Sequence, residues 1–209
     1  MRYFTTLLLT LLAFTVSAQN DPKAKEILDK AAVKFKSYPA AEVDFTMAME
    51  NKAENINETH QGKAWMKGNM YKLNLMDVEN YYDGKIIYTY MPEVQEVNIK
   101  NPSNEEEGFL NPAILFDIHN QGFDQKLVHT TNGIAYIELY PKEEKNFEKI
   151  GISVNPSTSS IQKVTSFGKD GNNVIITINN IKQLNPAPAD SFFKFDSNKH
   201  PGVEVVDMR

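Results

Sequence analysis

The chain has 209 residues, with 22 Lys and Arg against 27 Asp and Glu, so its formal net charge is −5. This mildly acidic balance argues against nucleic acid as a partner, because phosphate backbones are bound by basic surfaces. The chain contains no cysteine, which excludes disulfides, thiolate metal sites, cysteine nucleophiles and the lipid-attachment cysteine of a bacterial lipoprotein. We therefore expect a soluble protein that is not membrane-anchored.

Residues 1–18 have the pattern of an export signal. Arg2 supplies a positive start, residues 7–16 form an apolar stretch, and Val16-Ser17-Ala18 is a small-residue cleavage site. The apolar stretch is too short for a membrane-spanning helix. We predict cleavage after Ala18, a location in the periplasm, and a single domain over residues 19–209.

The mature chain opens with a predicted amphipathic helix. Asp21 is a candidate N-cap, and Pro22 follows at the first helical position, where its missing N–H costs nothing. Residues 37–39 end the helical pattern. The apolar stripe must pack on a neighbouring sheet, and it consists of Ala24, Ile27, Leu28, Ala31, Ala32 and Phe35.

From residue 41 onward, apolar residues recur at every second position, which indicates β-strands. Gly68-Asn69 and Asp83-Gly84 are typical of tight turns between paired strands, because Gly, Asn and Asp tolerate a positive φ. The pattern predicts strands at residues 41–49, 61–67, 70–75, 80–82, 85–91, 94–99, 126–131, 134–140, 149–155, 161–167, 174–181, 192–195 and 203–206.

Asn111-Pro112 repeats the helix-start signal, and residues 113–118 are nearly all apolar. A short helix that is apolar on most sides must be buried on most sides, so we expect it inside the concave face of the sheet or at its mouth. Residues 101–108, with Glu105-Glu106-Glu107, are expected to form an exposed loop. The predicted class is α+β, mainly antiparallel β, and we expect the thirteen short segments above to give a curled sheet of about ten or eleven strands.

No sequence motif points to catalysis. The nucleophile elbow, the P-loop, the dinucleotide fingerprint and H-E-x-x-H are absent. The histidines, which are His60, His119, His129 and His200, lack metal-ligand spacing. We predict no enzyme activity, no catalytic residue, no metal and no cofactor. A hydrolase that uses two strand-borne carboxylates stays open as the catalytic alternative.

Methionines are concentrated in the strands of the first half of the chain. Met is unbranched and polarizable, so it lines surfaces that accept varied apolar partners, and it equally fills irregular cores. Both interpretations remain open for Met47, Met49, Met66, Met70, Met76 and Met91.

Four stretches carry a resemblance to a known family. They are Q-G-K-A-W-M-K at 61–67, D-G-K-I-I-Y-T-Y-M-P at 83–92, N-P-A-I-L-F at 111–116, and F-K-F at 193–195 followed by V-E-V-V-D-M-R at 203–209. In this order they resemble the LolA family of periplasmic carriers of outer-membrane lipoproteins. Tyr88 stands where the family hairpin has Trp. The likeness spans nearly the whole mature chain.

The resemblance implies an unclosed antiparallel β-barrel, with helices as a lid over a hydrophobic cavity that holds acyl chains. It also implies acylated lipoproteins as cargo, an inner-membrane ABC-type lipoprotein-releasing complex as donor, and an outer-membrane receptor as a possible acceptor. We expect a monomer. The residues predicted to line the cavity are Val43, Phe45, Met47, Met49, Ala64, Met66, Tyr71, Leu73, Leu75, Ile114, Leu115, Phe116 and Ile118.

One departure from the family is evident at Gly68. Well-studied members carry Arg directly after the Lys of W-x-K, and that Arg governs lid closure and cargo transfer; here Gly68 follows Lys67. The lid must therefore be held differently, or cargo release must differ. Two alternatives stay open on the same scaffold: a carrier of another lipid or glycolipid, and a sensor of mislocalised lipoproteins that reports to a stress pathway.

Overall fold

Twelve strands of the described chain join in one sheet. The computed structural model describes residues 21–102 and 111–209. The strands are β1 (Ala41–Asn51), β2 (Ile56–Lys67), β3 (Met70–Leu75), β4 (Val78–Tyr82), β5 (Ile87–Met91), β6 (Glu96–Lys100), β7 (Phe123–Thr131), β8 (Ile134–Pro141), β9 (Phe147–Asn155), β10 (Ser160–Gly168), β11 (Asn173–Gln183) and β12 (Glu204–Asp207). The helices are α1 (Pro22–Lys36) and α2 (Pro112–Leu115), with 3₁₀ turns η1 (Ile118–Asn120), η2 (Asp190–Phe193) and η3 (Ser197–Lys199).

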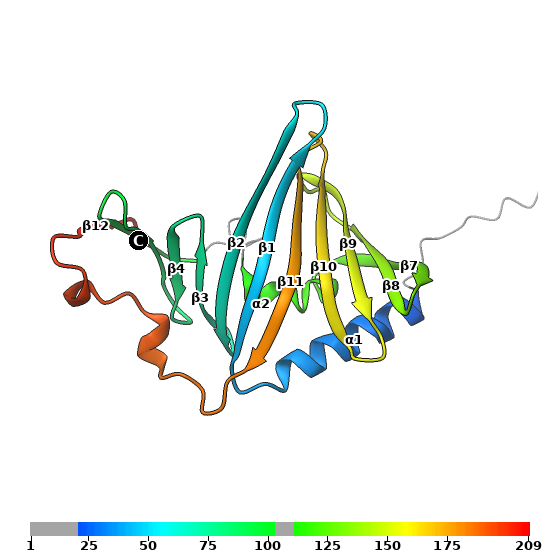
Figure 1. Ribbon diagram of the computed structural model, residues 1–209, viewed down its shortest axis with the longest axis horizontal. Helices are drawn as coiled ribbons and strands as arrows, with labels where there is room; N and C mark the ends of the chain where they lie inside the picture. Colours follow the sequence, from blue (N-terminus) through cyan, green and yellow to red (C-terminus); the bar gives the residue numbers. More distant parts are fainter. Residues whose placement is uncertain (1–20, 103–110) are drawn as a thin grey trace, which may run out of the picture.

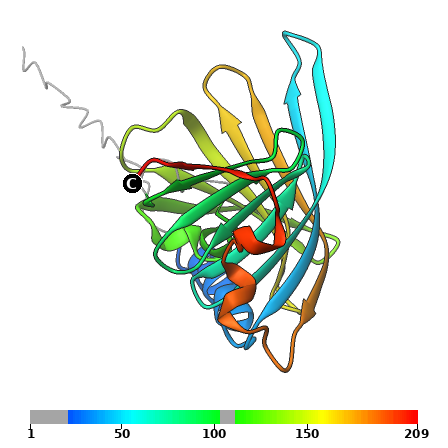
Figure 2. The same ribbon diagram turned by 90° about the vertical axis from the view of Figure 1, so that its left-hand side faces the viewer.

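The sheet is strongly curved and does not close (Figures 1 and 2). Its order is β12-β6-β5-β4-β3-β2-β1-β11-β10-β9-β8-β7, so β12 and β7 are the two edges. Short turns make sequential strands antiparallel neighbours, and β1 joins the two halves by pairing with β11. Among the strands of the described residues, only β12 is parallel to its neighbour, which is β6. The α+β class and the unclosed, mainly antiparallel sheet are confirmed.

The concave face of the sheet holds the main core. Along β1 the alternate residues from Ala41 to Met47 are buried, as the two-residue period predicts. Helix α1 contacts β7, β9 and β10 on this side. Its N-cap Asp21 accepts hydrogen bonds from the backbone N–H groups of Lys23 and Ala24. The predicted apolar stripe is buried except for Phe35, which is partly buried. The short helix α2 contacts β2 and β3, inside the curve of the sheet.

A second core lies on the opposite, convex face. The segment that follows β11 crosses the outside of the sheet before it adds β12 to the edge (Figure 2). Phe195 from this segment packs against Tyr81 and Tyr90, with ring centroids 6.0 and 5.0 Å away. Val97 is fully buried beneath it. This segment therefore covers β4, β5 and β6, which α1 and α2 leave uncovered.

The strand predicted at residues 192–195 is wrong, because Asp190–Phe193 forms the 3₁₀ turn η2. Phe193, at the end of this turn, and Phe195, just after it, are both buried because the segment packs on the outside of the sheet. The burial of both rings gives the same F-x-F pattern as a strand. The strand count exceeds the expected ten or eleven, and the parallel pairing of β12 is one that local pattern does not reveal.

Two sequence predictions lie outside the described residues: the export signal at residues 1–18 and the exposed Glu105-Glu106-Glu107 loop. Among residues 21–102 and 111–209, no helix combines the length and the apolar character needed to cross a bilayer.

On the convex face of β8, the buried carboxylate of Glu138 is stabilised by two neighbouring side chains. Glu138 is 8% exposed, receives a 2.5 Å contact from the Lys149 ammonium, and accepts a hydrogen bond of 2.5 Å from the Tyr140 hydroxyl. Burial acts to raise the pKa of Glu138, but the hydrogen bonds from Lys149 and Tyr140 hold that pKa below its usual value. The lowered pKa means that the pair stabilises the fold above the unfolded-state pKa of about 4.3, and that this stability is lost as pH falls further.

Lys149→Met is therefore expected to lower the free energy of unfolding by about 1.5–3 kcal/mol at pH 7, because it leaves a buried charge without its cation. The deficit should shrink at acid pH, as Glu138 becomes protonated. Urea unfolding at pH 7 and pH 3 measures both effects. The exposed Lys163→Met variant on β10 is the control, expected to change stability by less than about 0.5 kcal/mol. An equal loss of stability at pH 7 and at pH 3 would contradict the conclusion that Lys149 stabilises the ionised form of Glu138.

Candidate functional site

A wholly apolar cavity lies between the concave face of the sheet and α2. Its walls come from β1, β2, β3 and β11, and α2 with the residue after it closes the inner side. The cavity has a volume of about 30 Å³, close to the share of one water molecule in the liquid. In this structure it is therefore closed. It is lined by Val43, Phe45, Met47, Ala64, Met66, Leu73, Leu75, Pro112, Leu115, Phe116, Ile176 and Ile178.

Most of the residues predicted for a cavity come together here. Four do not line it: Met49, Tyr71, Ile114 and Ile118. Tyr71 is buried beside Tyr82 at a ring distance of 5.6 Å, and Ile118 is buried in the main core. Met49 lies farther along β1, and Ile114 faces the neighbouring β2–β3 turn. Their positions along the strands and the helical segment, not their polarity, separate them from the cavity.

Three lining residues were absent from the sequence prediction: Pro112, Ile176 and Ile178. The alternation of Val174, Ile176 and Ile178 was visible in the sequence, but only the pairing of β11 with β1 brings these residues to the cavity. Ile176 lies opposite Met47 in that pairing. Since β1 and β11 are far apart in the chain, no local pattern could indicate the contact.

Gly62 shapes the cavity wall through a close approach. It lies opposite Phe45 in the β1–β2 pairing, and a Cβ at position 62 would lie 2.2 Å from the tip of the Phe45 ring. The ring therefore rests on the Gly62 backbone, where any side chain would displace it. This contact explains why the Q-G pair of the sequence motif belongs at this place in β2.

The segment Pro112–Asn120, which we call the lid, is fastened to α1. The Phe116 ring stacks on Phe35 with centroids 3.6 Å apart and planes 4° apart. Two polar contacts accompany the stack: Lys36 Nζ lies 2.7 Å from Asp117 Oδ2, and His119 Nε2 lies 3.0 Å from Asp29 Oδ1. We call these three contacts the latch.

The aromatic stack is expected to contribute more to the latch than the Lys36–Asp117 ion pair. Lys36 is largely exposed, and exposed ion pairs contribute about 0–1 kcal/mol, whereas an aromatic pair adds about 0.5–1.5 kcal/mol beyond its buried area. Burial acts to raise the pKa of Asp117, but hydrogen bonds from Lys36 and Asn120 keep it below its usual value. The Lys25 hydrogen bond chiefly lowers the pKa of Asp29. Both carboxylates are therefore charged at neutral pH, and the polar part of the latch is intact there.

In the described part of the chain, no side chain that lines the cavity is suited to forming or breaking covalent bonds. Its lining has no titratable side chain, and residues 21–102 and 111–209 contain no group of three or more His, Asp or Glu that could hold a metal ion. What this arrangement can do is exclude water and surround an apolar chain, since apolar walls favour apolar guests by about 25 cal/mol for each Å² removed from water.

The family described as outer membrane lipoprotein carrier protein LolA matches this chain over residues 81–196, which is more than half of its length. The chain belongs to the LolA family. The matched region runs from β4 through the lid and β7–β11 to the Phe193-x-Phe195 pair, so it includes the lid and one wall of the cavity. No curated protein matches the chain.

Several solved structures are similar to this chain at low sequence identity. An uncharacterized conserved protein from Thermus thermophilus has a TM-score of 0.55 and 10% identity, with 88% of this chain and 99% of that chain covered. A LolA superfamily protein from Nitrosomonas europaea has a TM-score of 0.49 and 14% identity, with 83% and 98% covered. The MucA/MucB complex of Pseudomonas aeruginosa has a TM-score of 0.46 and 12% identity, with 84% and 62% covered. The first of these likenesses shows the fold alone.

The W-x-K residues that resemble the LolA motif lie on the convex face, away from the cavity. The Trp65 indole N–H donates to Glu42 at 2.8 Å, and its ring meets Phe192 edge-on at 5.7 Å. Lys67 donates to the Pro188 carbonyl at 3.0 Å and to Asp190 at 2.6 Å. These two motif residues therefore hold the C-terminal segment on the sheet.

Gly68 occupies the turn between β2 and β3 with φ +58°, a conformation that side-chain-bearing residues rarely adopt. The turn faces the lid across a small surface pocket that also contains Asp117. No Arg reaches the lid from this position, where well-studied LolA proteins have one. In this chain the latch fastens the lid to α1, and the buried Gln125 amide of β7 also donates to the His119 carbonyl of the lid at 2.8 Å.

Proposed function

We propose that this chain is an exported, periplasmic carrier that binds the acyl chains of lipoproteins between the concave face of its sheet and its lid, without catalysis. The observation that carries the proposal is a wholly apolar cavity closed by a short lid. Membership of the LolA family agrees with it. Each buried CH₂ of an acyl chain is worth about 0.8 kcal/mol, so a chain crossing an aqueous compartment needs such a host.

Because the cavity is closed, binding of an acyl chain requires a conformational change. A space of about 30 Å³ cannot hold an acyl chain, so the lid must move away from β2 and β3 as the chain enters. A ligand that binds only the open state shifts the population toward it, and the observed affinity is reduced by the cost of opening. The latch contributes to that cost.

The proposed partners follow from the role. A carrier of lipoproteins receives its cargo from an inner-membrane ABC-type releasing complex and delivers it to an acceptor at the outer membrane. We propose one carrier domain over residues 19–209 that acts as a monomer. The cavity lining of Met and aliphatic side chains suits chains of varied length.

Native mass spectrometry of the protein purified from its own periplasm tests the function. We expect a bound acylated polypeptide, and displacement of a fluorescent apolar probe by a synthetic triacylated peptide. A bound glycolipid or other small lipid would support the cavity as the binding site, but it would show that the cargo is that lipid and not a lipoprotein. No binding in either assay would overturn the proposal. The methionines of the strands would then be ordinary core residues.

A further inference from the structure

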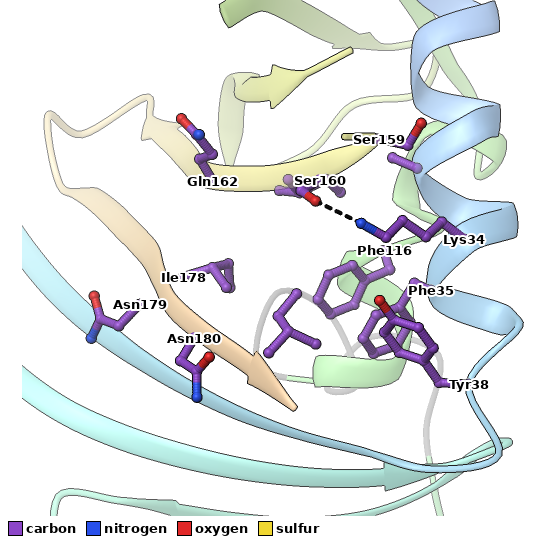
Figure 3. A pocket seen from close by; sticks show the side chains of 13 residues that line it. Lys34, Phe35, Tyr38, Phe116, Ser159, Ser160, Gln162, Ile178, Asn179 and Asn180 are labelled. Carbon is purple, nitrogen blue, oxygen red and sulfur yellow. Dashed lines mark hydrogen bonds between the residues drawn. The ribbon is translucent and has the colours of Figure 1, made fainter. Parts of the chain in front are cut away.

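Strands β10 and β11 separate at one end. They pair from Phe167 opposite Asn173 to Lys163 opposite Thr177, and no further. Beyond that point β10 continues to Ser160 along β9, while β11 continues to Gln183 along β1. Figure 3 shows the two strands diverging, with Ser160 on one side and Asn180 on the other. The sheet therefore has a gap between two strands that are neighbours elsewhere.

A β-bulge lies on each side of this gap. In β11, Asp44 pairs with Asn180 and Phe45 with Ile178, so Asn179 is the extra residue. In β10 the register against β9 shifts between Ile161 and Lys163, so Gln162 is the extra residue. Bulges bend a strand and end its pairing. The two bulges therefore keep β10 and β11 apart in this part of the sheet.

The gap is occupied by a pocket of about 300 Å³, ten times the volume of the closed cavity. Phe35, Tyr38 and Phe116 lie together on one side of it (Figure 3), and Ile161 also lines it. Phe116 and Ile178 line both this pocket and the closed cavity. The Phe116 ring, held by its stack on Phe35, therefore stands between the two spaces.

The rim of the pocket is polar and carries one positive charge. Lys34 Nζ donates to the Thr158 carbonyl at 2.7 Å and to Ser160 Oγ at 3.1 Å. In the described part of the chain Lys34 forms no ion pair with a carboxylate, so its charge is not neutralised there. The side chains of Gln162 and Asn180 are exposed elsewhere on the rim, and the Asn180 amide also donates to Asp44 at 3.5 Å. Such donors suit the ester and amide carbonyl oxygens at the head of an acylated N-terminus.

We propose that this gap is a lateral portal, through which acyl chains enter between β10 and β11 and pass Phe116 into the cavity, while the ester and amide carbonyls of the head stay at the Lys34 rim. This inference rests on the proposed function, since it specifies the route and the head-group chemistry of the same cavity. The lid then moves to make room, but it is not the opening through which the chain passes.

A cross-link across the portal tests the route, because the chain has no cysteine of its own. Gln162→Cys with Asn179→Cys places one thiol on each bulge, and a short bis-maleimide joins them. The control is Thr165→Cys with Ile175→Cys, which are register partners on the same two strands where pairing is continuous. Uptake of a fluorescent triacylated peptide is measured by stopped flow before and after cross-linking.

We expect the portal cross-link to slow uptake by about tenfold or more, which corresponds to a barrier about 1.4 kcal/mol higher, and the control cross-link to leave the rate unchanged. Equal uptake by both cross-linked proteins would overturn the portal and leave the proposed function standing. Failure of the unmodified protein to bind the peptide at all would overturn the proposed function, and the portal with it. Ser160→Cys with Asn180→Cys repeats the test if the first pair does not fold.

Discussion

Ile176→Glu is expected to weaken binding of a triacylated peptide by at least about a hundredfold, or about 2.7 kcal/mol. Ile176 lies in the cavity wall opposite Met47 and Val164, and only 7% of it is exposed. A carboxylate at this point would be buried against an acyl chain without a partner, which costs several kcal/mol. Titration of the purified variant with the fluorescent peptide measures the effect.

Ile175→Glu is the matched control, with the same substitution of the same residue type one position earlier. Ile175 lies opposite Ala48 and Thr165 on the other face of β11 and is only partly buried. Its binding should stay within about threefold of the wild type, since surface changes are usually within about 0.5 kcal/mol. Circular dichroism must show that both variants fold, and Ile176→Thr replaces the Glu variant if it does not. A folded Ile176 variant with unchanged binding would refute the cavity assignment.

Phe35→Ala is expected to release the lid. Loss of the stack on Phe116 removes about 0.5–1.5 kcal/mol of aromatic interaction and a larger packing contribution from the truncated side chain. Because the closed state competes with binding, weakening it by about 1–2 kcal/mol should raise the affinity for acyl chains about five- to thirtyfold. The gain should appear mainly as faster uptake, because the stack stabilises only the closed, empty state. Stopped-flow uptake and competition release give the two rates.

The control for Phe35→Ala is Val33→Ala on the same helix. Val33 is 69% exposed, so its truncation leaves the lid contacts in place while making a similar change in helix composition. We expect wild-type rates for it. If Phe35→Ala folds and takes up the peptide with wild-type affinity and rates, the stack does not hold the lid closed.

Much of the fold could be read from residue periodicity. The helix that begins after Asp21, the alternation along β1, and the turn at Gly68 each follow from short-range rules of capping, pleating and positive φ. The strand predicted at Phe192–Phe195 was wrong because Asp190–Phe193 forms a 3₁₀ turn, and a segment that packs two Phe rings on a sheet gives the same F-x-F pattern as a strand within it. Periodicity reports which side of the backbone is buried, not which partner buries it.

The sequence by itself determined the class of the fold, the apolar character of one face of each strand, and the short lid helix at Pro112. Tertiary structure alone decided that Ile176 meets Met47, that the Phe116 ring stacks on Phe35, and that the bulges at Gln162 and Asn179 face each other across a gap. The physical reason is separation along the chain. Capping, turns and pleating act over a few residues, whereas a cavity, a latch and a portal arise only where distant segments are brought together.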